Sequence, residues 1–212
     1  MGVRRNVPGL RPILREGDLE SHAVVLHNAV CKVTAAMADG RQALLAIRVT
    51  GDVVGETSAL NHTPRSATVT TCRPSTVAVI REVDFRSFLK QHPDAAVEMA
   101  GMTAGRLRWA NRRRVDFASY PVKVRLARVI ADIAETYGYD SPSGTEIGVR
   151  LTQLELATLC GAAEVSVQKA LRELRSEKAV STAQRRVVVS DMATLRSMAE
   201  LDGVSGAIDE CR

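Results

Sequence analysis

The segment 151–178, LTQLELATLCGAAEVSVQKALRELRSEK, constrains the fold more than any other part of this 212-residue chain. Thr152 is followed three residues later by Glu155, which is the spacing of a capping box, where a hydroxyl and a carboxylate each satisfy a backbone amide at a helix start. Gly161 supplies the conformational freedom for a tight turn, and Glu164 begins a second helix. The segment therefore predicts two short helices joined by a glycine turn.

The second predicted helix has two different faces. Its apolar residues fall at offsets of three and four and form one stripe for packing: Val167, Ala170, Leu171 and Leu174. The opposite face mixes charged, amide and small apolar side chains, as the reading of base edges in a DNA major groove requires: Glu164, Val165, Ser166, Gln168, Lys169 and Arg172. Thr152 is a further candidate DNA contact. The alternative is an ordinary amphipathic hairpin with a solvated polar face.

Residues 180–190, VSTAQRRVVVS, change from helical to strand composition. We expect a small hairpin with its turn at 183–185, which makes the motif a winged helix-turn-helix. Arg185 and Arg186 would then face the DNA backbone, where each neutralised phosphate releases condensed counterions. A last short helix is predicted over 192–200, capped by Asp191 or Ser190.

The composition fits two modest domains and a polyanionic partner. Hydrophobic residues make up 45% of the chain, and 29 Lys and Arg face 24 Asp and Glu, a formal charge of +5. No apolar run approaches the length of a membrane span, and the N-terminal MGVRRNVPGL lacks the apolar core of a secretion signal. We therefore expect a cytoplasmic protein with no membrane partner.

The cysteines and histidines show no spacing typical of a metal site or a catalytic centre. They are scattered along the chain, at Cys31, Cys72, Cys160 and Cys211 and at His22, His27, His62 and His92. The sequence accordingly predicts free thiols, no metal, no catalytic residues and no enzymatic activity.

Residues 11–84 alternate short apolar runs with turn signals, a pattern typical of an antiparallel β-sandwich or roll. The turns carry Gly17, Gly40 and Gly51, each suited to a positive φ. One segment, 55–69, reads GETSALNHTPRSATV and breaks the strand pattern. We interpret it as a ligand site.

The chemistry of this segment suits an anion that carries hydroxyl groups. Gly55 allows close approach of a backbone amide, Glu56 offers a carboxylate to a hydroxyl pair, and the helical turn that Thr57 opens presents free amides. Arg65, with the Ser66 hydroxyl and the amides around Ala67, can hold a phosphate in bidentate fashion. The alternative is that Glu56 and Arg65 simply pair with each other.

A long helix is predicted over 93–117, and its positions step by four and three as in a coiled-coil seam: Ala96, Ala100, Thr103, Leu107, Ala110, Arg114 and Phe117. The seam predicts dimerisation, although the same residues can pack a single intramolecular helix. Pro121 ends the helix and marks a hinge. We expect a further helix over 122–137 and a polar loop over 138–148.

These motifs together resemble the cyclic AMP receptor protein and fumarate-nitrate regulator (CRP/FNR) family of bacterial transcription factors. The resemblance rests on REGD at 15–18, the cassette GE(x)3L(x)3PRSA at 55–67, the long helix and LTQLELATLCG at 151–161. It implies an α+β fold with an N-terminal antiparallel β-roll of the cyclic-nucleotide-binding jelly-roll type, a dimerisation helix and a winged helix-turn-helix. The implied boundaries are 1–92, 93–120 and 121–212.

By the same resemblance the chain is a homodimeric, sequence-specific regulator of transcription that binds double-stranded DNA, with RNA polymerase as a candidate partner. No cofactor is required, and cyclic AMP or cyclic GMP is the candidate ligand. Glu56 would hold the ribose hydroxyl, and Arg65 with Ser66 the cyclic phosphate. The Thr-Ser pair that contacts the base in cyclic AMP receptors is replaced here by Ala110 and Asn111, and alanine cannot form a side-chain hydrogen bond.

Two other functions remain compatible with the sequence. One is a regulator of the same architecture that is controlled by a protein partner or by its own abundance. The other is an interaction protein whose basic surface binds acidic proteins.

Overall fold

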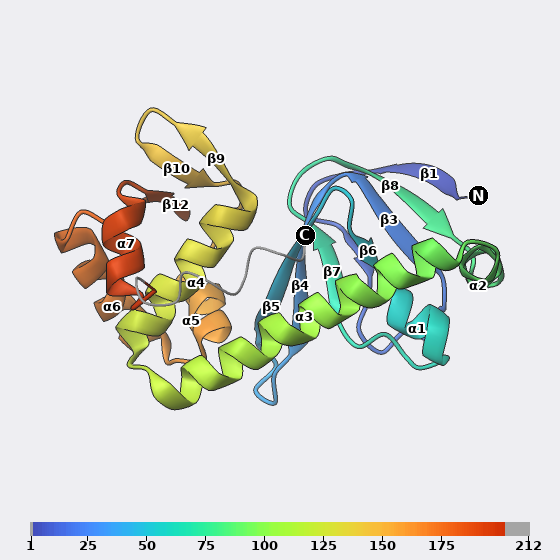
Figure 1. The fold of residues 1–212 in the computed structure, drawn as a ribbon, viewed down its shortest axis with the longest axis horizontal. Coiled ribbons are helices and arrows are strands. Elements are labelled where there is room, and N and C mark those ends of the chain that lie inside the picture. The colour runs from blue at the N-terminus through green and yellow to red at the C-terminus, as the bar shows by residue number, and fades with distance from the viewer. Residues whose placement is uncertain (1, 202–212) are drawn as a thin grey trace. The chain divides into compact units, whose positions relative to one another are not determined.

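The computed structural model describes residues 2–201, and the chain divides into two compact units, 1–110 and 111–212 (Figure 1). The division falls inside the long helix α3 (Pro93–Ser119), so each unit holds part of this helix. The sequence also predicts a C-terminal tail over 201–212, of which residues 202–212 lie outside the described part of the chain.

The first unit contains two four-stranded antiparallel sheets, which confirms the predicted β-roll. One sheet has the order β1 (Val3–Val7), β8 (Ser75–Ile80), β3 (Ala23–Asn28) and β6 (Val53–Val54). The other has the order β2 (Pro12–Leu14), β7 (Thr68–Thr71), β4 (Val30–Ala36) and β5 (Gln42–Val49). The apolar runs expected between residues 11 and 84 form β2, β3, β4, β5, β7 and β8.

The core of this unit lies between the two sheets. Its buried residues come from the inward faces of strands in both sheets, among them Leu14, Val24, Leu26, Cys31, Val69 and Val77. The predicted glycine turns are present, with φ of 82° at Gly17, 81° at Gly40 and 96° at Gly51. Burial of these aliphatic side chains between the sheets is the main source of stability of the roll.

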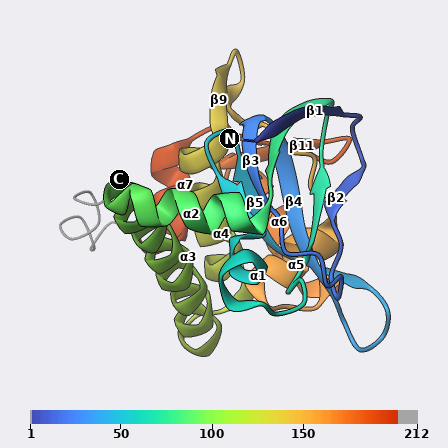
Figure 2. The same ribbon diagram turned by 90° about the vertical axis from the view of Figure 1, so that its right-hand side faces the viewer.

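Two short helices, α1 (Glu56–Asn61) and α2 (Glu82–Gln91), lie together at one end of the sheets (Figure 2). Phe85 of α2 is buried against Ala23, Ala59 and Ile80, and Met99 of α3 packs on the same cluster. Helix α2 was not predicted, because the strand pattern of β8 runs directly into it and its N-cap position, Arg81, forms no side-chain cap.

The second unit is built around α4 (Val122–Tyr137), whose bounds agree with the predicted ones. It packs against α5 (Gln153–Cys160), α6 (Glu164–Ser176) and α7 (Met192–Met198). A four-stranded sheet completes the unit, in the order β11 (Val180–Ala183), β12 (Arg186–Val189), β10 (Gly144–Ile147) and β9 (Gly138–Ser141). The predicted winged helix-turn-helix is therefore confirmed.

The prediction of a polar loop over 138–148 was wrong, because this segment forms the hairpin β9–β10. Its strands are short and mostly polar, so they lack the alternation by which strands are recognised. They are held instead by pairing of β10 with the wing strand, where Thr145 lies opposite Val189. Gly144 has φ of 118°, and a Cβ there would clash with the Val189 carbonyl oxygen.

We predict that Leu174→Ala lowers the free energy of unfolding by about 2–5 kcal/mol, because this side chain of α6 is fully buried and its removal leaves a cavity. Urea denaturation followed by circular dichroism measures the change. Val165→Ala is the matched control on the same helix, since Val165 is 77% exposed, and it should change stability by less than about 0.5 kcal/mol. Equal losses in the two variants would contradict this packing of α6.

Candidate functional site

The start of the helix-turn-helix has the predicted capping box. The backbone amide of Glu155 donates to Thr152 Oγ1 at 3.1 Å, and the amide of Thr152 donates to Glu155 Oε2 at 2.8 Å. At the other end of α5, Gly161 adopts φ of 60°, a left-handed C-cap that turns the chain toward α6. Since the Thr152 oxygen already accepts a hydrogen bond, its hydroxyl proton is the group left for a phosphate.

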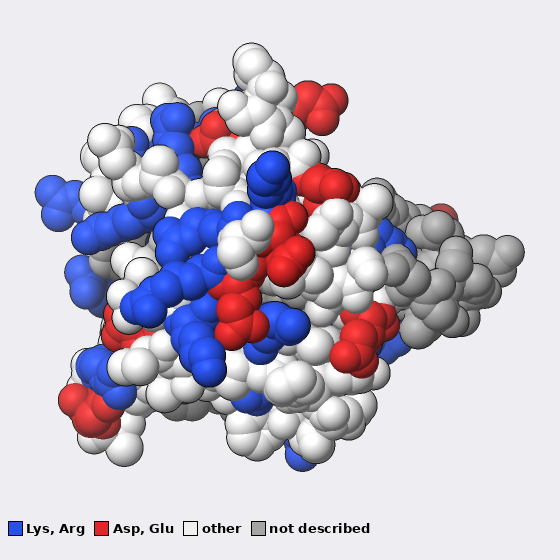
Figure 3. Space-filling model, turned by 90° about the vertical axis from the view of Figure 1, so that its left-hand side faces the viewer, with Lys and Arg blue, Asp and Glu red and all other residues white. Residues whose placement is uncertain are grey.

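Helix α6 is divided into a buried and an open face, as predicted. Its apolar stripe is buried: Val167, Ala170, Leu171 and Leu174. The predicted base-contacting face is open, with Gln168 half-buried and the remaining residues exposed, namely Glu164, Val165, Ser166, Lys169 and Arg172. Figure 3 faces the second unit and shows Lys and Arg side chains gathered on one half of that surface, beside a band of acidic ones. A surface of this kind suits a polyanion.

The wing is tied to the helix-turn-helix at two points and to β10 at a third. Arg175 of α6 donates to Thr182 Oγ1 on β11 at 3.1 Å, and the amide of Leu151 donates to the Arg185 carbonyl oxygen at 2.8 Å. Arg186 lies 3.5 Å from Glu146 of β10. The predicted turn is one residue shorter than expected, because Ala183 belongs to β11 and pairs with Arg186.

A buried ion cluster joins the end of α3 to α4 and α7. Asp116 is 5% exposed, and its carboxylate accepts from Arg128 at 2.8 Å and lies 3.4 Å from Arg113. The Arg128 guanidinium also stacks on Tyr120, 3.8 Å from the ring centroid, and Nε donates to the Ala199 carbonyl at 2.8 Å. The stretch before Pro121, predicted as a hinge, is therefore anchored within the second unit.

A second contact links α3 to the turn of the helix-turn-helix. Arg125 of α4 is buried, donates to the Gly161 carbonyl oxygen at 3.1 Å and lies 4.9 Å from the centroid of the Phe117 ring. Phe117 is nevertheless 61% exposed. The last turn of α3 thus reaches the turn between α5 and α6 through one arginine.

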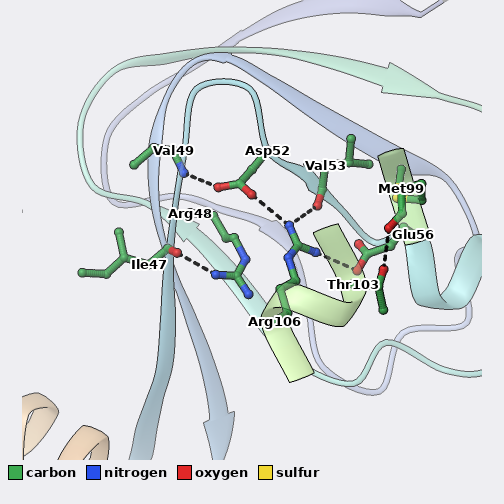
Figure 4. Close-up of polar contacts among 9 residues, drawn as sticks. All are labelled: Ile47, Arg48, Val49, Asp52, Val53, Glu56, Met99, Thr103 and Arg106. Carbon is green, nitrogen blue, oxygen red and sulfur yellow. Dashed lines mark hydrogen bonds and ion pairs between the residues drawn. The ribbon is translucent and has the colours of Figure 1, made fainter. Parts of the chain in front are cut away.

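In the first unit the predicted ligand segment forms α1 and its flanking turns, and Gly55 adopts φ of 78° there. Glu56 does not pair with Arg65. Its carboxylate accepts instead from Arg106 of α3 at 2.8 Å, and Arg106 also donates to Asp52 at 3.0 Å and to the Val53 carbonyl at 2.8 Å (Figure 4). These three contacts of Arg106 fix the middle of α3 to the β-roll.

Arg106 was missed as a site residue by the sequence analysis. A signal was present, because Arg106 precedes Ala110 by four residues and so lies on the same side of the helix. What the sequence did not show was that Asp52 and Glu56 converge on this position.

Arg65 is a buried residue of the first unit. It is 3% exposed and donates to the carbonyl oxygens of Gly55 at 2.8 Å and of His22 at 2.5 Å, while its Nε has no hydrogen-bond partner in the described structure. Burial lowers the pKa of this guanidinium, although the nearby carboxylates of Glu20, Asp18 and Glu56 act in the opposite direction and raise it. Ser66 and Thr57 are exposed and Ala67 is half-buried. A phosphate would therefore have to share or replace a carbonyl partner of Arg65.

The predicted seam of α3 lies largely open in the single chain. Leu107 is 61% exposed, and Ala100, Thr103, Ala110 and Arg114 are also exposed, whereas Ala96 is half-buried. Asn111, the second predicted base contact, is exposed as well. Within residues 2–201 no three His, Cys, Asp or Glu side chains are grouped as a metal ion requires, and no helix there is long and apolar enough to span a membrane.

Two family models match the chain, and together they cover most of it. Residues 4–92 match the cyclic nucleotide-binding domain, and residues 124–198 match the Crp-like helix-turn-helix domain. The chain belongs to the CRP/FNR family of transcriptional regulators. The family assignment that the sequence motifs suggested is thereby confirmed, together with the predicted α+β fold.

Several relatives and solved structures are similar to this chain over 80% or more of its length. The CRP-like cAMP-activated global transcriptional regulator of Mycobacterium tuberculosis is 26% identical over 86% of this chain and 82% of its own length. The anaerobic regulatory protein of Bacillus subtilis is 26% identical over 80% of this chain and 71% of its own.

Among solved structures, a CRP/FNR-family regulator of Thermus thermophilus superposes with a TM-score of 0.78 at 18% identity, over 93% of this chain and 98% of that one. The c-di-GMP responsive regulator CLP of Xanthomonas campestris superposes with a TM-score of 0.75 at 21% identity, over 90% of this chain and 94% of that one. At these identities the superpositions show a shared fold.

We predict that Asp116→Asn lowers the free energy of unfolding by about 3 kcal/mol, because it removes a buried carboxylate charge that faces two poorly exposed guanidinium groups. Urea denaturation measures the loss. Asp140→Asn is the control, since Asp140 is exposed in the same unit, and its effect should stay within about 0.5 kcal/mol. A stability unchanged by Asp116→Asn would contradict the anchoring role of the cluster.

Proposed function

We propose that this regulator acts in the cytoplasm as a homodimer that binds double-stranded DNA sequence-specifically through α6 and the wing, and that a cyclic nucleotide in the β-roll gates it. The observation that carries the DNA-binding part is the division of α6. Its apolar stripe is buried while the charged and amide side chains of the other face are open to a partner.

The open face of α6 offers complementary groups for the major groove. Glu164 accepts a hydrogen bond from cytosine, Lys169 donates to guanine, and Val165 contacts a thymine methyl group. Arg172 and the wing residues Arg185 and Arg186 place cations against the duplex backbone, where such charges fix the position of the helix. Gln168, Ser166 and Thr152 complete the proposed interface.

The exposed side of α3 supports the dimer. Its seam carries small and apolar residues in coiled-coil spacing, and they lie open in the single chain. A twofold mate packed along this seam would present two copies of α6. For both to enter one face of the duplex, they must lie about 34 Å apart, which is one turn of DNA.

The cassette supports gating by cyclic AMP or cyclic GMP. The name of the Mycobacterium tuberculosis relative describes activation by cAMP. In this chain Glu56 would bind the ribose hydroxyl, and Arg65 with Ser66 and the amides near Thr57 and Ala67 would bind the cyclic phosphate. Ligand must then compete with Arg106 for Glu56 and with two carbonyls for Arg65. Asn111 rather than Ala110 supplies any hydrogen bond to the base.

A second function has its own support. Because Glu56 and Arg65 are both engaged by groups of the chain itself, the β-roll is held together without a ligand. A regulator of this architecture can respond instead to a protein partner, with RNA polymerase as one candidate, or to its own abundance.

We predict that Lys169→Ala weakens binding to the operator by roughly 5- to 100-fold and relaxes its base preference at one position, because a contact to a base edge is lost. The operator is first selected from random DNA, and affinities are measured by gel shift over a range of salt. Lys32→Ala, a lysine of the β-roll, controls for the loss of one charge. Operator affinity that hardly falls with added salt would exclude phosphate contacts and so contradict the proposed interface.

Calorimetry with cyclic AMP and cyclic GMP tests the gating. The proposal predicts binding of one of them, weakened roughly tenfold or more by Glu56→Gln because the ribose acceptor loses its charge. Glu98→Gln, at an exposed position of α3, should leave the affinity unchanged. Absence of binding by the unmodified protein would favour the ligand-independent regulator.

A further inference from the structure

The tip of the wing has an unusual turn. Gln184 and Arg185 alone connect β11 to β12, because Ala183 and Arg186 are already paired. Both tip residues have positive φ, 49° and 67°, as a two-residue type I′ turn requires. Asn-Gly is the favoured sequence for such a turn, since left-handed backbone is strained for residues with long side chains. Here both positions carry long polar side chains at the expense of turn stability.

The Arg185 side chain differs from its basic neighbours Arg175 and Arg186 in having no side-chain partner among residues 2–201. Arg175 is held by Thr182, and Arg186 lies 3.5 Å from Glu146. Arg185 is exposed and forms no ion pair with any residue in 2–201. Its guanidinium is therefore available for a partner outside the chain.

The backbone of the tip is nevertheless fixed. The Arg185 carbonyl oxygen accepts from the amide of Leu151 at 2.8 Å, and Leu151 immediately precedes Thr152, the N-cap of α5. The tip consequently lies beside the start of the helix-turn-helix. In the proposed complex, with α6 in the major groove, an element in that place would meet DNA outside the base pairs that α6 covers.

We propose that Arg185 and Gln184 read the minor groove next to each half-site and favour A·T pairs there. The inference rests on the proposed DNA-binding function. A narrow A·T-rich minor groove has an enhanced negative potential that attracts arginine, and its N3 and O2 acceptors suit the donors of Arg185 and of the Gln184 amide. A phosphate contact alone does not explain an arginine in a strained turn. A cation at a strand position, such as Arg186, can contact a phosphate without that strain.

Inosine separates minor-groove reading from every major-groove effect. Inosine lacks the 2-amino group of guanine, so an I·C pair matches G·C in the major groove and resembles A·T in the minor groove. The selected operator is prepared with A·T, G·C or I·C pairs flanking the half-sites. We expect the unmodified protein to bind the A·T and I·C forms with similar affinity and about tenfold more tightly than the G·C form.

Substitutions at the wing tip show which residue produces the preference for A·T and I·C flanks. Arg185→Ala should reduce the flank preference to less than about twofold, whereas Arg186→Ala should weaken all three forms equally. The double variant Gln184→Asn with Arg185→Gly should melt a few degrees higher, because it has the favoured turn sequence, and should lose the preference.

Equal binding of the I·C and G·C forms by the unmodified protein would overturn the inference, and so would a flank preference that survives in Arg185→Ala. Both results leave the operator itself intact, so the DNA-binding function would stand. Failure to select any operator from random DNA would instead overturn the proposed function on which the inference rests.

Discussion

The burial of one stripe of α6 against α4 is the contact on which the rest of the second unit depends. Val167 and Leu174 have no exposed surface, and with them buried the charged and amide side chains of α6 can only face outward. The capping box at Thr152 and the left-handed Gly161 set the angle at which α6 meets α4. The open polar face of α6 is thus a consequence of core packing.

Arginine side chains connect α3 to the remainder of each unit. Arg106 binds Asp52 and Glu56 of the β-roll, and Arg128 binds Asp116 while it stacks on Tyr120. Both contacts are poorly exposed, so breaking either leaves charges with little solvation. One helix therefore has a fixed point in the first unit and another in the second.

Most of the fold could be predicted from the sequence, because its signals are local. The spacing of Thr152 and Glu155 sets the start of α5, and Pro121 separates α3 from α4. The hairpin β9–β10 could not be predicted, since its polar strands are stabilised by pairing with β12, a segment distant in sequence. The same holds for the site: the cassette could be located by its motif, but the partners of Glu56 and Arg65 depend on which chain segments meet. Alternation and spacing carry no information on such contacts.

The proposed dimer places two copies of α6 in the major groove of one duplex. Protection of guanine N7 from dimethyl sulfate reports occupancy of that groove directly, because N7 lies on its floor. On the selected operator the account predicts two protected segments whose centres lie one helical turn, about 10 base pairs, apart. A single protected segment would contradict the dimer, and unprotected guanines across a bound operator would contradict the placement of α6.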